Sequence, residues 1–143
     1  MKTSLPKAAE IQERTWFLLD AAGKTPGQIA TVCARLLQGK HKATFTNHLD
    51  VGDGVVVINV EQIQFSGDKL MQKKYRTHSG HLGHLKETSA GKLLESNPEK
   101  VLFLAVSGML PKNRLRKGRL ARLKVFQGEA HNMSGQKPEK FEF

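Results

Sequence analysis

The sequence of 143 residues has few of the residue types from which disulfides, cysteine-based metal sites and aromatic clusters are built. It contains one cysteine, one tryptophan and one tyrosine. A single cysteine cannot form an intramolecular disulfide and excludes a four-cysteine zinc site, so Cys33 is interpreted as a small buried hydrophobe. No apolar run approaches the ~20 residues that span a bilayer, and the N-terminus lacks the apolar segment of a signal peptide. We therefore expect a cytoplasmic protein.

Acidic residues are absent from the stretch 111–124, which carries seven Lys and Arg residues. The whole chain has a net charge of +10, so most of this excess lies in one short segment. Such a block repels itself unless an anion neutralises it, and a polyphosphate backbone is the commonest partner. A solvated basic helix is the alternative. Arg outnumbers Lys here, and its planar fork suits bidentate phosphate contact, which favours nucleic acid.

If residues 111–124 are helical, leucines at 115, 120 and 123 can anchor the helix to its own domain. The basic side chains between them would then point outward, and Gly118 could bend or break the helix. On this interpretation the residues that face RNA phosphates are Arg114, Lys117, Arg122 and Lys124.

A second basic region spans residues 69–92, where Glu87 is the single glutamate and no aspartate occurs. Tyr75 can stack on a base or ribose, and the glycines at 80 and 83 allow the backbone to approach a phosphate closely. Histidines recur at 78, 81 and 84 in what we interpret as a glycine-containing loop. A zinc site is the alternative use of these histidines, but Glu87 is the only nearby carboxylate, so RNA contact is preferred.

The tripeptide Gly23-Lys24-Thr25 follows the first apolar run and resembles part of a nucleotide-binding loop. A Walker A motif needs a glycine where this chain has Leu18, inside the expected strand. Free N–H groups at the start of the next helix could instead hold an RNA phosphate beside Lys24. A small basic cluster, 40–42, follows the same helix.

The pattern of apolar residues predicts an α/β fold. Runs at 15–21 and 54–60 are typical of buried strands, the second without alternation, as in a sheet covered on both sides. Between them, Thr25 as N-cap, Pro26 and Gly39 delimit an amphipathic helix. Asn97 and Pro98 predict the start of another helix, which Gly108 and Pro111 end. We expect one domain over residues 15–127, an N-terminal arm at 1–14 and an extended tail at 128–143.

Several motifs extend over nearly the whole chain and resemble one family. GMLPKNRL at 108–115 and YRTHSG at 75–80 are the most specific, and WFLLDA, GKHK and VVVINVEQI lie in the same order and spacing. Together they resemble the bacterial "L-thirteen" family of large-ribosomal-subunit proteins. The chain departs from that family at GHLGHLK (80–86), where a GYPGGLK-like loop is common, and at Phe126, where a tyrosine is common.

The resemblance implies a three-layer α/β/α domain with a parallel four-stranded sheet in the order 3-2-1-4. It also implies a structural constituent of the large subunit that assembles early, binds ribosomal RNA and neighbouring ribosomal proteins, and needs no cofactor. An RNA-processing or nucleotide-dependent enzyme on the same sheet is the alternative. A translational repressor that binds messenger RNA is a third possibility, and it is compatible with the role in the large subunit. The residues expected to contact RNA are Lys24, Lys40, His41, Lys42, Lys69, Lys73, Lys74, Tyr75, Arg76, His78, Ser79, Gly80, Lys86, Lys112, Asn113, Arg114, Arg116, Lys117, Arg119, Arg122 and Lys124.

Overall fold

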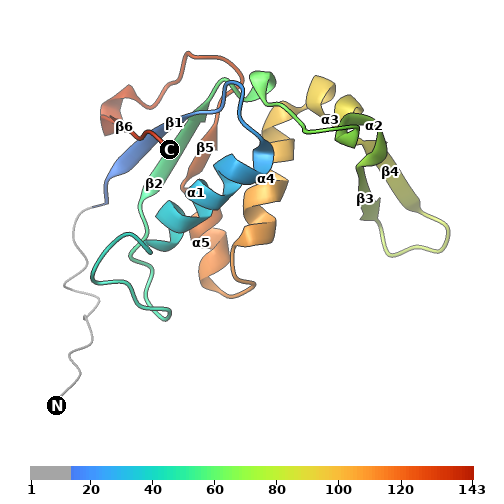
Figure 1. Ribbon diagram of the computed structural model, residues 1–143. Coiled ribbons are helices and arrows are strands. Elements are labelled where there is room, and N and C mark those ends of the chain that lie inside the picture. The colour runs from blue at the N-terminus through green and yellow to red at the C-terminus, as the bar shows by residue number, and fades with distance from the viewer. Residues whose placement is uncertain (1–13) are drawn as a thin grey trace.

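The computed structural model describes residues 14–143, so the expected N-terminal arm lies outside the described residues except for Arg14. Its centre is a four-stranded parallel sheet in the spatial order β5-β2-β1-β6 (Figure 1). Numbered along the chain, these strands follow the order 3-2-1-4, which confirms the expected sheet. The strands are β1 (Trp16–Asp20), β2 (Gly54–Ile58), β5 (Leu123–Val125) and β6 (Glu139–Lys140).

Helix α1 (Pro26–Gln38) begins and ends where its local signals predict. The Thr25 hydroxyl accepts a hydrogen bond from the Gln28 N–H, and the Gln28 side chain accepts one from the Thr25 N–H, which completes a capping box. Gly39 adopts φ of 79° and closes the C-terminus, a conformation that glycine takes without steric cost. Cys33 is fully buried on the apolar face of α1, as expected, and burial raises the pKa of its thiol to about 12.

The core lies between α1, the sheet and helix α4 (Pro98–Met109), which packs along α1. Val55 and Val57 of β2 belong to the same hydrophobic core as Leu102 and Val106 of α4, and all four are fully buried. Asn97 caps α4 by accepting a hydrogen bond from the Lys100 N–H at 3.0 Å, which confirms the predicted start. The arrangement is consistent with the expected three-layer α/β/α class. None of the helices within residues 14–143 has both the length and the apolar character needed to cross a membrane.

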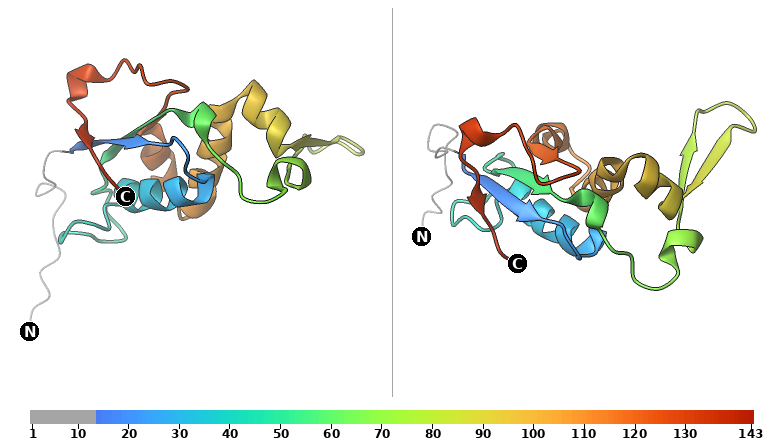
Figure 2. Two further views of the ribbon diagram at one scale, coloured as in Figure 1. Left: turned by 45° about the horizontal axis from the view of Figure 1, so that its top comes forward. Right: turned by 90° about the horizontal axis from the view of Figure 1, so that it is seen from above.

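Residues 69–96 form a subdomain-like projection to one side of the sheet (Figures 1 and 2). A one-turn helix α2 (Lys69–Gln72) leads into an antiparallel hairpin, β3 (Lys74–His78) and β4 (Leu85–Ser89), followed by α3 (Ala90–Ser96). The glycine-containing loop expected around the histidines is the connection between β3 and β4, although His78 itself ends β3. The two strands were not predicted, because almost all of their side chains are exposed and give no apolar alternation.

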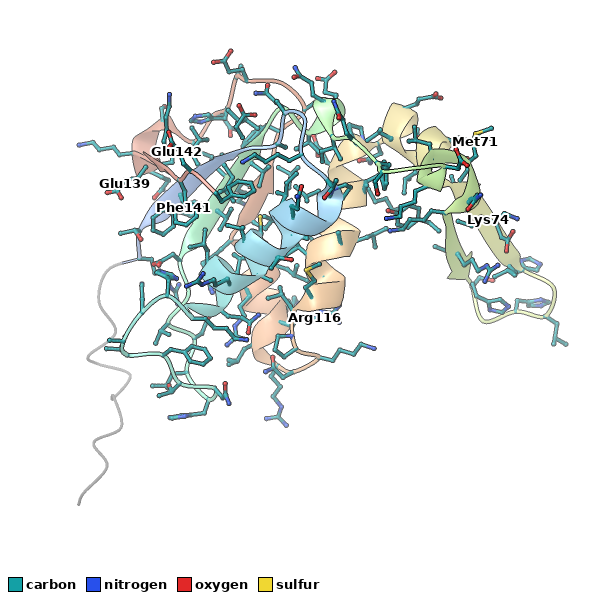
Figure 3. The ribbon with its side chains drawn as sticks, in the orientation of Figure 1. Met71, Lys74, Arg116, Glu139, Phe141 and Glu142 are labelled. Carbon is teal, nitrogen blue, oxygen red and sulfur yellow. The ribbon has the colours of Figure 1, made fainter. Side chains whose placement is uncertain are left out.

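The basic segment 111–124 is divided between two elements. Helix α5 (Leu115–Ala121) continues through Gly118 without a break, and Lys124 lies in strand β5 rather than on a helix. The tail from 128, expected to be extended, contains a 3-10 turn (Ser134–Gln136) and strand β6. Strand β6 pairs in parallel with β1, and Phe141 beyond it packs edge-on against Phe17 at 5.6 Å between ring centroids (Figure 3).

Candidate nucleic-acid interface

The small basic cluster after α1 is held by a buried carboxylate. Asp53, with no exposed surface, accepts hydrogen bonds from the Lys42 ammonium at 2.6 Å and from the Thr15 N–H at 3.1 Å. His41 Nε2 lies 2.7 Å from the other Asp53 oxygen. Of the three basic residues expected to contact RNA here, Lys42 and His41 therefore point toward the domain, and Lys40 is exposed.

A second carboxylate, Asp50, organises the end of the basic segment. Arg122 donates to both of its oxygens, at 2.7 and 2.6 Å, and Arg119 Nε lies 3.6 Å away. Burial alone would raise the pKa of Asp50, but the Arg122 hydrogen bonds and the nearby guanidinium charges outweigh it and lower that pKa. The Arg119 side chain is only 2% exposed and that of Arg122 12%.

Arg122 thus turns toward Asp50 in the folded chain, and its expected contact with RNA stays a prediction. Residues 116, 119 and 122 recur every three positions, which places them on one side of α5. The Arg116 guanidinium also turns inward and donates to the carbonyl oxygen and the hydroxyl of Ser107 on α4 (Figure 3). These three arginines dock α5 onto the domain, a role that sequence reasoning missed because their partners lie elsewhere in the chain.

The other cations of this segment remain available. Lys112, Arg114 and Lys117 are exposed and form no ion pair with any residue of 14–143. Lys112 and Arg114 lie in the turn that connects α4 to α5, with the exposed Asn113, and Lys117 lies in the first turn of α5. We call these three cations the α5 turn cluster. Lys124 is also exposed, on the edge strand β5.

On the hairpin, two of the expected RNA-binding cations already have an acidic partner. Lys74 and Arg76 donate to the two Glu87 oxygens at 2.9 and 2.7 Å (Figure 3). These hydrogen bonds lower the pKa of Glu87. Lys86 is exposed, and Lys73 Nζ lies 5.2 Å from the centre of the Tyr75 ring, which is half-buried.

Three histidines lie at the tip of the hairpin, His78 at the end of β3 and His81 and His84 in the loop. His78 Nδ1 accepts a hydrogen bond from the Gly80 N–H at 2.9 Å, while the rings of His81 and His84 lie 4.9 Å apart. Ser79 and Gly80 are exposed at the same end, and Lys69 donates to the Ser66 hydroxyl at the base. Within residues 14–143, no group of three or more His, Cys, Asp or Glu side chains is placed to hold a metal ion.

The Gly23-Lys24-Thr25 turn is occupied by contacts within the protein. The Lys24 ammonium donates to a backbone oxygen of Phe143 at 2.7 Å and lies 3.4 Å from the centre of its ring. The Thr25 hydroxyl belongs to the capping box of α1. Lys24 thus contacts the C-terminal residue Phe143, and a phosphate would have to displace Phe143 to reach the Lys24 ammonium.

Two groups of exposed cations lie on the α5 turn cluster and on the hairpin, and others, such as Lys40 and Lys124, lie elsewhere on the domain. This arrangement defines a small basic α/β domain suited to a polyanionic partner. The family model "Ribosomal protein L13" matches residues 14–132. The chain belongs to the ribosomal protein L13 family.

Relatives match over almost the full length of both chains. A "Large ribosomal subunit protein uL13" from Clostridioides difficile (strain 630) is 52% identical over 143 residues, covering 100% of this chain and 99% of the relative. Proteins of the same name from Nitratidesulfovibrio vulgaris and Exiguobacterium sibiricum are 51% and 48% identical, each covering 99% of this chain and 98% of the relative.

Proposed function

We propose that this chain is a structural, non-catalytic constituent of the large ribosomal subunit, located in the cytoplasm as part of the ribosome. It binds large-subunit ribosomal RNA and contacts neighbouring ribosomal proteins. The observation that carries this proposal is membership of the L13 family, with relatives named as large-subunit proteins that match from end to end.

The α5 turn cluster is the principal RNA anchor in this proposal. Lys112, Arg114 and Lys117 have no acidic partner among the described residues, so phosphates can neutralise them without breaking an ion pair. Each phosphate contact releases condensed counterions, which makes the affinity depend strongly on salt. The inward arginines Arg116, Arg119 and Arg122 position the cluster by docking α5, and need not touch RNA themselves.

The hairpin supplies a second contact surface through Lys73 and Lys86, with Lys40 and Lys124 as further exposed cations. Lys74, Arg76, His41, Lys42 and Lys24 have partners inside the protein and contact RNA only if those partners are shared or displaced. Early assembly fits a protein that reaches RNA through two separated basic parts, because it can join two RNA segments.

The test is the sedimentation of the untagged protein from a cell lysate at low and at high salt. We expect it to travel with the large subunit and to stay there in salt that removes loosely bound basic proteins. A protein that remains at the top of the gradient in low salt would overturn the proposal. Binding to messenger RNA alone would place the protein in fractions free of large-subunit ribosomal RNA, which separates a repressor from a constituent.

A further inference from the structure

A cavity of about 370 Å³ lies between the hairpin and helix α4, away from the α5 turn cluster. Its floor is apolar and includes Leu104 of α4, which is 39% exposed because no other part of residues 14–143 covers it fully. Tyr75 of β3 forms one wall and is half-buried. We call this cavity the hairpin pocket. Its size falls within the ~300–1,000 Å³ typical of pockets that hold small organic groups.

The charge of the hairpin pocket is entirely positive. Lys73, Arg76 and Lys100 line it, and no acidic residue does. Lys73 and Lys100 form no ion pair with any residue of 14–143. The hairpin register explains why no acidic side chain lines the pocket. Glu87 lies opposite Arg76 and pairs with it, whereas Thr88 lies opposite Tyr75 and lines the pocket.

An aromatic wall, an apolar floor, hydroxyl groups and cations form the combination that a nucleotide requires. Proteins bind unstacked bases on aromatic rings and hold their phosphates with Lys and Arg. Bases within an A-form duplex are stacked and cannot enter such a pocket, so its ligand must come from a loop or bulge. An acidic peptide would satisfy the cations but would leave the face of Tyr75 without a matching planar group.

We propose that the hairpin pocket receives one unpaired nucleotide of large-subunit ribosomal RNA, with its base against Tyr75 and Leu104 and its phosphate between Lys73 and Lys100. This inference rests on the proposed function and adds the class of RNA element that the hairpin recognises. On this proposal the hairpin recognises an unpaired nucleotide, whereas surface charge alone would only attract phosphates.

The first experiment compares the affinity of the full chain and its variants for large-subunit ribosomal RNA transcribed in vitro. Tyr75→Leu removes the planar ring and is expected to weaken binding about tenfold, the effect typical of one base–aromatic stack. Tyr75→Phe keeps the ring and is expected to bind like the parent chain. Against a perfectly paired RNA duplex, Tyr75→Leu should bind as tightly as the parent. An equal loss on both RNAs, or no loss on ribosomal RNA, would overturn the proposal.

A second pair of variants works even if Tyr75→Leu disturbs the hairpin. Leu104 and Phe103 are neighbours on α4 with almost equal exposure, 39% and 40%, but only Leu104 lines the hairpin pocket. Leu104→Glu places a carboxylate where the nucleotide would lie, and Phe103→Glu adds the same charge outside the pocket. We expect a loss of affinity at least tenfold larger for Leu104→Glu, since it adds repulsion to blocked entry. Equal losses would contradict a local site.

Photocrosslinking identifies the RNA element directly. Large-subunit ribosomal RNA carrying 4-thiouridine should crosslink to Tyr75 or Leu104 through an unpaired nucleotide, and the crosslink should disappear in Leu104→Glu. Crosslinks only from paired regions would overturn the proposal while leaving the ribosomal function intact. If the parent chain does not bind ribosomal RNA at all, the proposed function itself fails, so the two failures are distinguishable.

Discussion

Asp50 and Arg122 form a bidentate ion pair although 72 positions separate them in the sequence. Asp50 lies on the connection between α1 and β2, and Arg122 lies between α5 and β5. The pair therefore ties the loop after α1 to the end of the basic segment. Because Arg119 also approaches the same carboxylate, one acidic residue fixes the orientation of α5 and of the cations at its start.

Replacing Asp50 by Asn should destabilise the protein at pH 7. The change leaves Arg119 and Arg122, both largely buried, without their shared counter-charge. We expect a decrease of about 2–3 kcal/mol in the free energy of urea unfolding, somewhat below the cost of breaking a fully buried pair because Asp50 is 20% exposed. Asp68→Asn is the control, since Asp68 is exposed and unpaired among the described residues. A decrease no larger than in this control would contradict the role given to Asp50.

The contribution of Asp50 to stability should disappear in acid. Its folded pKa lies below the ordinary value of 3.8, so the unfolded chain takes up the proton first as the pH falls. The ionised Asp50 therefore stabilises the fold fully at pH values above the ordinary pKa of 3.8. This stabilisation is lost as the pH falls through the lower pKa of the folded state. Urea unfolding of the parent chain and Asp50→Asn at several pH values should show a stability difference that narrows below about pH 4. A constant difference would argue that the pair carries no charge-dependent energy.

Removing the α5 turn cluster should weaken RNA binding without affecting the fold. We expect Lys112→Gln, Arg114→Gln and Lys117→Gln together to lower the log–log salt slope of ribosomal RNA binding by up to about 2.7, at ~0.9 for each phosphate that is no longer neutralised. The unfolding free energy should stay within ~0.5 kcal/mol of the parent value, because these side chains are exposed. Filter binding across a range of salt concentrations measures the slope.

The matched control removes three exposed cations outside the expected interface, by replacing Arg35, Lys137 and Lys140 with Gln. Its net charge equals that of the cluster variant, so a general decrease in charge would change both slopes equally. Equal slopes would show that RNA does not select the α5 turn cluster.

Asp53→Asn should loosen the loop between α1 and β2. The buried carboxylate binds Lys42, His41 and the Thr15 N–H. The neutral amide of Asn carries no negative charge to pair with the Lys42 ammonium. We expect about 3 kcal/mol of destabilisation together with faster hydrogen exchange in residues 40–53. Unchanged exchange in this loop would mean that backbone packing, rather than Asp53, holds it.

The parts of this fold that sequence predicts are those with local signals. The limits of α1 follow from Thr25, Pro26 and Gly39, all within one helix length, and Asn97 identifies the start of α4 in the same way. The buried strand β2 follows from its unbroken apolar run. The sheet order came from the resemblance to a family, because spacing along one chain does not reveal which strands pair.

The inward arginines could not be predicted because their partners have no local signal. A pattern on α5 shows that Arg116, Arg119 and Arg122 share one side, but not that Asp50 and Ser107 lie next to that side. The hairpin was missed for a different reason. Its strands are exposed on both faces, so the alternation that normally indicates a strand is missing from their sequences.

Strand β6 should join this sheet after the other three strands have paired. It contributes only two residues, and its pairing with β1 closes a loop that includes nearly the whole described chain. Such a pairing gains little enthalpy for a large decrease in chain entropy, so it should form last during folding and open first in the native state. The free edge of β1 is then the point at which an incompletely folded chain is most exposed to edge-to-edge association, and the packing of Phe141 on Phe17 is the step that protects this edge.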